Sequence, residues 1–482
     1  MTILRESENC WRIARADRMA VIVDADIYFR LARDAFLQAK RRIMLVGWDF
    51  DARIHLTTEE RLPGEPESVG EFLYWLVERR PELELYLLRW DVGAIKTLGR
   101  GSTAFTVLKW MRHPRIHTKL DGAHPAAASH HQKIVSIDDT FAFCGGIDRT
   151  GDRWDTRDHR DDDPGRIGPN GAPYMPWHDA TSALAGPVAA TLGDLCRERW
   201  LRATGETLAP ISQSGDIWPE TLDPQFRNVD AGIARTFPEI EDYPASHEIE
   251  ALFVDQITAA RTAVYMESQY FASRKVAEAI ARRLDEANGP EFIIVNPHAA
   301  QGWLEPVAMD SARARLMEAL RRRDKYRRLK MYHPVTTAGA PIYVHAKITF
   351  IDDRQLRIGS ANLNNRSMRL DSECDIIVDA AQNGDAHVNA AITAMRDDLL
   401  AEHLGVSPEA VTKAVAQTGS LIAAVEQLRG EGRTLVPYEV PDLSAVEAWL
   451  ADHEVLDPEG PDEMFEPLSA RGLFRRLRKP KV

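Results

Sequence analysis

Apolar residues recur at spacings of three and four over two long stretches, and each stretch leads into a nearly continuous apolar run. Residues 24–42 precede IMLVGWDF (43–50), and residues 247–263 precede VYMESQYF (264–271). The spacing of three and four places one apolar face along a helix. The continuous run is typical of a strand that is covered on both faces of its sheet. The chain therefore predicts the same helix–strand unit twice.

Further matches follow in the same order along the chain. The tripeptide IAR stands at residues 13–15 and again at 233–235, and the apolar strand at 83–90 has a counterpart at 291–297. Matches in one order indicate an internal duplication. We predict an α/β fold of two similar mixed-sheet halves, at residues 1–205 and 226–405, joined by a linker at 206–225. Residues 406–482 have no repeat partner and predict a small, mostly helical extension with a basic tail.

Composition and charge narrow the class of protein. The chain has 482 residues, 44% hydrophobic and 28% charged, which fits two soluble domains. The net charge of −13 gives no overall basic surface, so we expect no stable nucleic-acid partner. The four cysteines lie far apart without a CxxC pair, which argues against a thiolate zinc site and a disulfide scaffold. With no secretory signal and no spanning apolar run, we expect a cytoplasmic protein.

One polar, glycine- and proline-rich segment interrupts the first half at residues 155–176. Its histidines and aspartates raise the question of a metal site. No ligand spacing recurs among them, so we interpret the segment as a solvated loop and predict no metal ligands.

The two halves share one polar motif, H-x-K-x4-D, in HHQKIVSIDD (130–139) and VHAKITFIDD (344–353). Its members are His131, Lys133 and Asp138 in the first half and His345, Lys347 and Asp352 in the second. Within a strand, residues two apart share a face, so each histidine and lysine point the same way. Each aspartate lies five residues past its lysine, which predicts a structural hydrogen-bonding role near the strand end. The pair His117 and Lys119 lacks the later aspartate and is interpreted as loop.

A small-residue turn follows each motif at the same distance. Twelve residues after Lys133 and Lys347 the chain reads Gly145-Gly146-Ile147-Asp148 and Gly359-Ser360-Ala361-Asn362. Small residues let the backbone approach a bound group, and hydroxyl and amide groups donate hydrogen bonds to phosphate oxygens. The turns therefore predict substrate contacts at Gly145, Gly146, Ser360 and Asn362.

At these residues the chain resembles the phospholipase D superfamily, which carries two HxKxxxxD motifs. RWD (153–155), PWHD (176–179), ESQYF (267–271), NxRS (364–367) and DSE (371–373) resemble its phosphatidylcholine-type branch. The resemblance implies two α/β halves that meet face to face about a pseudo-two-fold axis and share one active site. It also implies catalysis without a metal ion or other cofactor. Asp148 stands where many members place asparagine, and we expect it not to contact the substrate.

The resemblance also implies roles for the motif residues. One histidine attacks phosphorus to form a phosphohistidine, and the other transfers protons. Family precedent makes His131 the nucleophile and His345 the general acid and base, although the near-symmetry leaves their order open. Lys133 and Lys347 supply positive charge to the developing anion. The resemblance further suggests that Asp179 orients His131 and that Glu373 orients His345.

Several functions fit this pattern. We expect a phosphodiesterase that hydrolyses a phospholipid head group, or transfers the phosphatidyl group to an alcohol. The alternatives are a cardiolipin synthase-like phosphatidyltransferase, a nuclease, and a catalytically silent membrane-binding scaffold. The intact histidines and lysines argue against the scaffold. We expect a monomer that acts on a phospholipid or another phosphodiester. The tail LFRRLRKPKV, at the end of the chain, is compatible with peripheral contact at the inner membrane surface or with a disordered terminus.

Overall fold

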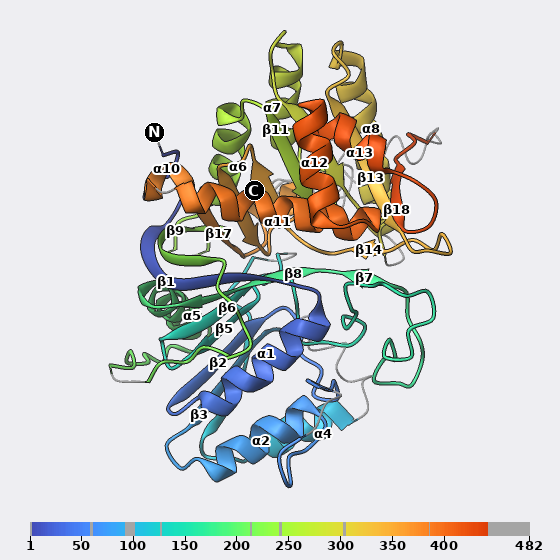
Figure 1. Cartoon of the computed structure of the whole chain (residues 1–482). Coiled ribbons are helices and arrows are strands. Elements are labelled where there is room, and N and C mark those ends of the chain that lie inside the picture. The colour runs from blue at the N-terminus through green and yellow to red at the C-terminus, as the bar shows by residue number, and fades with distance from the viewer. Residues whose placement is uncertain are drawn as a thin grey trace, which may run out of the picture.

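The fold places two similar lobes side by side (Figure 1). The computed structural model describes residues 2–57, 61–91, 102–125, 128–212, 215–240, 243–301, 305–384 and 386–441. Within these residues, none of the helices has the length and apolarity needed to cross a bilayer. The basic tail at 471–482 lies outside the described residues.

The first half contains the helix predicted at 24–42 and the strands predicted at 43–50 and 83–90, together with further elements. Its strands are β1 (Arg12–Val23), β2 (Arg42–Gly47), β3 (Glu84–Trp90), β4 (Ile116–Asp121), β5 (Ile134–Ile137), β6 (Phe141–Gly145), β7 (Trp177–His178) and β8 (Ala180–Ala185). Its helices are α1 (Ala25–Gln38), α2 (Val69–Arg79), α4 (Ser102–Trp110) and α5 (Pro187–Thr204).

The second half repeats this order and continues beyond it. Its strands are β9 (Phe226–Phe237), β10 (Ser246–His247), β11 (Ala263–Glu267), β12 (Glu291–Val295), β13 (Leu329–Val335), β14 (Tyr343–Val344), β15 (Ile348–Ile351), β16 (Gln355–Gly359), β17 (Glu373–Asp379) and β18 (Thr434–Pro437). Its helices are α6 (Glu248–Ala259), α7 (Arg274–Asp285), α8 (Glu305–Arg323), α9 (Asn365–Arg369), α10 (Ala380–Asn383), α11 (Ala386–Leu404), α12 (Pro408–Thr418) and α13 (Leu421–Leu428).

One continuous sheet runs through both halves. Its strand order is β18-β13-β12-β11-β15-β16-β17-β9-β1-β8-β6-β5-β2-β3-β4. β1 and β9 are antiparallel neighbours at its middle, with Arg12 opposite Ile233 and Met19 opposite Phe226. Outward from this seam, each strand of the first half has its counterpart at the same place in the second half, and β18 adds one further strand at the end of the second half. The order confirms the predicted α/β fold of two similar halves.

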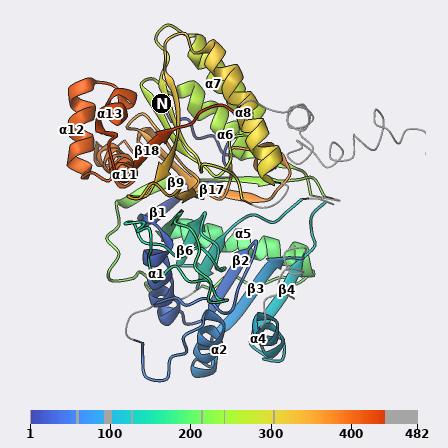
Figure 2. The same cartoon turned by 90° about the vertical axis from the view of Figure 1, so that its right-hand side faces the viewer.

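Alternate residues of the strands enter different cores, as the period of two requires. Ile43 and Leu45 of β2 pack with α1 and α2, whereas Met44 and Val46 enter a core that both halves build together with α5 and α11. In the second half, α6, α7 and α8 cover one face of the sheet, and α11, α12 and α13 cover the other (Figure 2). Burial on both faces explains the continuous apolar runs in the sequence.

The motif aspartates have the structural role that their spacing predicted. Asp138 accepts backbone N–H groups of Lys40, Arg41 and Arg42 at 2.7, 2.8 and 2.6 Å. Asp352 does the same in the second half, where it accepts from Thr262 N at 2.8 Å and from neighbouring N–H groups. Each carboxylate therefore fixes the start of the adjacent strand, β2 or β11.

Two local predictions were wrong, and a third, the mostly helical C-terminal extension, omitted one strand. His117 and Lys119 lie in β4 rather than in a loop. The segment at 155–176 is anchored in the protein, because Asp155, His159 and Arg166 are at most 2% exposed. Residues 406–441 are not only helical, since β18 pairs with β13 and extends the sheet of the second half beyond residue 405.

Replacing Asp138 by asparagine should destabilise the protein, because one amide oxygen cannot accept three N–H groups as a carboxylate does. We expect a loss of about 1–3 kcal/mol in the free energy of unfolding, measured by urea denaturation. Asp158→Asn is the matched control, since the Asp158 side chain is 66% exposed. Equal stability of the two variants would contradict the structural role of Asp138.

Candidate active site

Each motif histidine lies on a segment that pairs with the opposite half. His131 N donates to Ser372 O at 2.9 Å, and Ser372 N donates to Ser129 O at 2.9 Å. In the same way His345 N donates to His178 O at 2.7 Å, and β14 pairs in parallel with β7. Both segments end where β5 and β15 begin. The histidines and lysines thus lie just before these strands, and their backbone is held across the interface.

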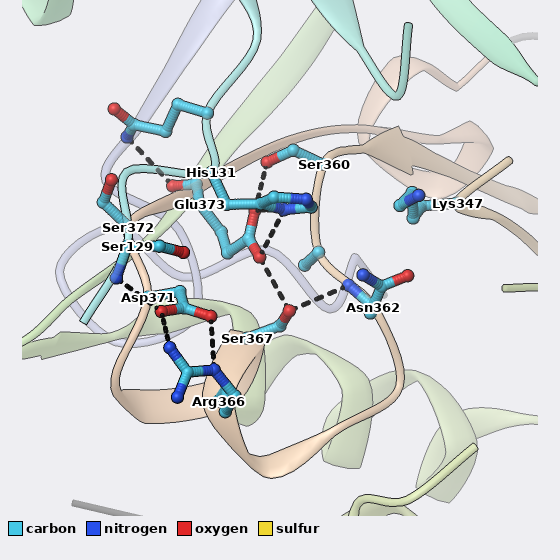
Figure 3. A network of polar contacts seen from close by, with 12 residues as sticks. Ser129, His131, Lys347, Ser360, Asn362, Arg366, Ser367, Asp371, Ser372 and Glu373 are labelled. Atoms are coloured by element: carbon cyan, nitrogen blue, oxygen red, sulfur yellow. Dashed lines mark hydrogen bonds and ion pairs between the residues drawn. The ribbon is translucent and has the colours of Figure 1, made fainter. Parts of the chain in front are cut away.

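The side chains repeat this crossing. His131 Nδ1 lies 3.0 Å from both carboxylate oxygens of Glu373, as Figure 3 shows. His345 Nδ1 lies 2.7 Å from Asp179 Oδ2. An ionised carboxylate can only accept, so with Glu373 and Asp179 ionised each Nδ1 carries the hydrogen and each Nε2 keeps its lone pair. The structure brings together all four residues but reverses the expected pairing: Glu373 orients His131, and Asp179 orients His345.

The pairing is reversed for a geometric reason. Asp179 precedes β8 and Glu373 begins β17, and these strands belong to the halves opposite their histidines. Each carboxylate therefore reaches across the interface to the loop that the other half contributes.

Two serines hold the Glu373 carboxylate. Ser360 Oγ donates to Glu373 Oε2 at 2.5 Å, and Ser367 Oγ donates to Oε1 at 2.7 Å (Figure 3). Ser360 was predicted to contact the substrate, but its hydroxyl donates to Glu373 and accepts a hydrogen bond from Cys374 N at 3.0 Å. Ser360 is thus a positioning residue for Glu373. Ser367 was flagged in sequence only as part of the NxRS motif.

The glycines of the first turn lie where a side chain would clash. A Cβ on Gly146 would lie 2.3 Å from Asp179 Oδ1, and one on Gly145 would lie 2.3 Å from Thr181 Cα. Their N–H groups donate to the carbonyls of Ala180 and Lys133 at 2.8 and 3.4 Å. Close packing accounts for both glycines, and the predicted substrate contact of Gly145 and Gly146 stays a prediction.

The two lysines have different neighbours. Lys133 Nζ donates to His131 O at 2.8 Å and lies 3.2 Å from Asp148 Oδ2, so Asp148 neutralises it. Lys347 Nζ donates to His345 O and to Gln269 Oε1, both of them neutral acceptors. Asp148 thus contacts a lysine, and the expectation that it avoids the substrate stays a prediction.

Asn362 lies in the turn that follows β16. Its side chain is buried beside Lys347 on the side of the His131 ring that faces away from Ser372 (Figure 3). Its Oδ1 makes no hydrogen bond within the described part of the chain. A buried acceptor without a donor costs free energy, but an amide oxygen cannot donate to phosphate, so the predicted contact between the Asn362 amide nitrogen and the substrate stays a prediction.

Burial and the lysines set the protonation of this site. The pKa of His131 lies well below its ordinary value because the ring is buried, with Lys133 and Lys347 adding to the effect. Burial also raises the pKa of Glu373 to about 8, although Lys133 and the two serines oppose the shift. Burial likewise lowers the pKa of Lys347 to about 7. Burial therefore disfavours the charged forms of these side chains, and His131 is a neutral base at physiological pH.

Aromatic and cationic residues line the second histidine. Trp177 stacks on Tyr343 at 4.6 Å and lies 5.3 Å from His345, measured between ring centroids. The Arg153 guanidinium lies over Trp177 at 4.2 Å. Sequence reasoning marked Arg153 and Trp177 only through the RWD and PWHD motifs and assigned them no contact. Tyr343 lay outside every motif, and its position two residues before His345 was its only signal.

Comparisons with known proteins agree with this geometry. A family model described as "Cardiolipin synthase, PLD-like domain" matches residues 253–393. Phospholipase D alpha 1 of Carica papaya is 24% identical over 77% of this chain, and that of Arabidopsis thaliana is 25% identical over 78%. These matches, together with the two HxKxxxxD motifs, support the phospholipase D superfamily as the family of this chain. The chain spans 63% of the length of each of these two plant relatives.

A solved structure supports the fold. Phosphatidylserine synthase of Haemophilus influenzae superposes with a TM-score of 0.54 and 14% identity. The match covers 86% of this chain and 96% of that one. At this identity the likeness shows the arrangement of the two halves and says nothing of the substrate.

The raised pKa of Glu373 predicts a pH-dependent stability difference. Above its ordinary value of 4.5 the unfolded chain releases this proton, whereas the folded protein keeps it until about pH 8. The wild type therefore loses stability as the pH rises through this window, and Glu373→Gln does not. Between pH 6.5 and 8.5, urea denaturation should show the variant gaining on the order of 1–2 kcal/mol relative to the wild type.

The matched control is Glu82→Gln, because the Glu82 side chain is 71% exposed. Its difference from the wild type should be the same at both pH values. Parallel pH profiles for Glu373→Gln and the wild type would show that the folded protein does not hold the Glu373 proton.

Proposed function

We propose that this protein is a phosphodiesterase that cleaves phospholipid head groups through a phosphohistidine. The observation that carries the proposal is the pair of neutral histidines whose Nδ1 atoms are held by Glu373 and Asp179. This arrangement aims two Nε2 atoms from opposite halves into one site with two lysines. In-line displacement at phosphorus needs such a pair, one on each side of the phosphorus atom.

The proposed reaction has two steps. His131 Nε2 forms a bond to phosphorus while the bond to the head-group oxygen breaks, and His345 Nε2–H gives its proton to that oxygen. His345 then takes a proton from water, whose oxygen bonds to phosphorus as the bond to His131 breaks. The bound anionic phosphodiester raises the pKa of His345, so that this histidine becomes protonated and can act as the acid. Lys133, Lys347 and Asn362 stabilise the charge on the non-bridging oxygens.

An alcohol can accept the phosphatidyl group in place of water, and the assay should test both acceptors. An alcohol that replaces water in the second step makes the enzyme a phosphatidyltransferase. Two findings favour testing it: the match to a model described as a cardiolipin synthase domain, and the fold likeness to a phosphatidylserine synthase. We further propose a monomeric protein with a membrane lipid as substrate, reached by peripheral contact.

Phosphatidylcholine vesicles in buffer with ethanol should yield phosphatidic acid and phosphatidylethanol, resolved by mass spectrometry. Phosphatidylglycerol and single-stranded DNA, run in parallel, separate the transferase and nuclease alternatives. His131→Asn and His345→Asn should each lower turnover by about 10³-fold or more. His117→Asn is the matched control, since His117 lies in the chain's third HxK sequence and stacks on Tyr86. Cleavage of DNA alone would overturn the proposal.

The order of the histidines follows from a substrate whose leaving group needs no acid. With phosphatidyl-p-nitrophenol, His345→Asn should release about one p-nitrophenolate per enzyme and then stop, because water is not deprotonated. Mass spectrometry should find the phosphatidyl group on His131. A burst from His131→Asn instead, with the adduct on His345, would reverse the roles.

A further inference from the structure

A second cluster of histidines and carboxylates lies behind the candidate active site. Its members are Asp24 before α1, His159 in the segment 155–176, His178 in β7 and Glu402 in α11. All four are at most 5% exposed. One nitrogen or oxygen of each lies within 4.8 Å of the corresponding atoms of the other three. Three separate parts of the first half and one helix of the second thus converge on one point.

The atoms that face away from this point are already held. His178 Nε2 lies 2.8 Å from Glu267 Oε2, and His159 Nδ1 lies 3.0 Å from Asp155 Oδ2. Glu402 Oε2 accepts from Arg157. Asp24 Oδ1 accepts Asp179 N at 3.1 Å, although this oxygen also lies 3.3 Å from His178 Nδ1 and so borders the centre. A histidine with one nitrogen on a carboxylate and the other turned to a common centre has the arrangement of a metal ligand with its supporting partner.

The atoms that face the centre are incompletely satisfied. Asp24 Oδ2 and His178 Nδ1 are buried and make no hydrogen bond within the described residues. His178 Nδ1 lies 2.9 Å from Glu402 Oε1, and His159 Nε2 lies 3.1 Å from Glu402 Oε1 and 3.5 Å from Asp24 Oδ2. In a tetrahedral zinc site with bonds of about 2.05 Å, neighbouring ligand atoms are about 3.3 Å apart. These three distances are close to the edges of such a site, and all four atoms lie within 4.8 Å of one another.

We propose that Asp24, His159, His178 and Glu402 bind one divalent transition-metal ion of the zinc type, in a closed structural site. Two imidazole nitrogens favour such an ion over calcium or magnesium, which prefer oxygen. The two carboxylates balance its charge. The ion takes no part in the reaction, because four protein ligands leave no open position. It ties the segment 155–176 and α11 to the first half.

The site would also position the candidate active site. Asp24 Oδ1 accepts the N–H of Asp179, and His178 O accepts the N–H of His345. The ion would therefore fix the backbone on both sides of the hydrogen bond between Asp179 and His345. This consequence rests on the proposed function, whereas the metal site itself does not.

The competing arrangement contains no metal. In it both histidines are protonated and form an ion-pair network with Asp24 and Glu402. Carboxylates on all sides raise the pKa of His159 to about 9 and that of His178 well above its ordinary value, against the effect of burial. Geometry alone describes both arrangements, so the experiment must separate them by counting metal.

Elemental analysis by mass spectrometry of the untagged protein, dialysed against metal-free buffer, should find about one zinc or similar ion per chain. His159→Gln and Glu402→Gln should each lower this to a small fraction, and the melting temperature of the wild type should fall when a strong chelator removes the ion. His113→Gln is the matched control, because His113 also lies 2.7 Å from a carboxylate, Glu78, yet outside the cluster. It should keep its metal.

Protein produced with cobalt in place of zinc provides a test without mutation, should the variants fail to fold. It should show the intense visible absorption of tetrahedral cobalt with nitrogen and oxygen ligands. Wild-type protein without stoichiometric metal, whose melting temperature does not respond to added zinc, cobalt, manganese or iron, would overturn the site and leave the ion-pair network. Because these readouts do not use turnover, they stand or fall separately from the phosphodiesterase assay.

Discussion

The hydrogen bonds that cross between the halves are the constraint on which the site depends. His131 is held by Glu373 and by the carbonyl of Ser372, and His345 by Asp179 and the carbonyl of His178. Neither half contains a histidine together with its own carboxylate partner. A single half would therefore present an imidazole with an undefined tautomer, and the arrangement of two opposed Nε2 atoms exists only when both halves are docked.

The continuous sheet makes this docking rigid. The β1–β9 seam joins the halves by backbone hydrogen bonds, and both halves contribute to the core that lies over α5 and α11. Two faces of every central strand are buried, so a shift of one half against the other would expose apolar surface as well as break the ladder. The same seam brings the loops before β5 and β15 into the register that the crossed hydrogen bonds need.

The fold class could be predicted, and the four motif residues could be singled out, because both depend on spacing within each half. The pairing of the carboxylates could not, because it depends on which loop of the opposite half is nearest, and no pattern within one half encodes that distance. The segment at 155–176 was misread for a similar reason. Its composition is that of a solvated loop, but His159 is buried against Asp155, His178 and Glu402 of α11, the last of which lies more than 200 residues further along. Ser360 and Gly146 were correctly placed in the site, but their partners decide their roles.

The departures from symmetry distinguish the two histidines. Aspartate is one methylene shorter than glutamate, and Asp179 packs against Gly146, where a side chain would clash, whereas the matching Ser360 donates to Glu373. Glu373 offers both oxygens to His131 and is held by two hydroxyls, so the ring it orients is fixed in position. Fixed orientation suits a nucleophile that must approach phosphorus in line. Among the described residues Lys347, beside His345, has no carboxylate as close as Asp148 is to Lys133, so an anionic phosphate bound there would favour the charged form of Lys347. The two near-identical motifs thus differ in the residues that surround them. This difference supports the proposal that His131 is the attacking residue.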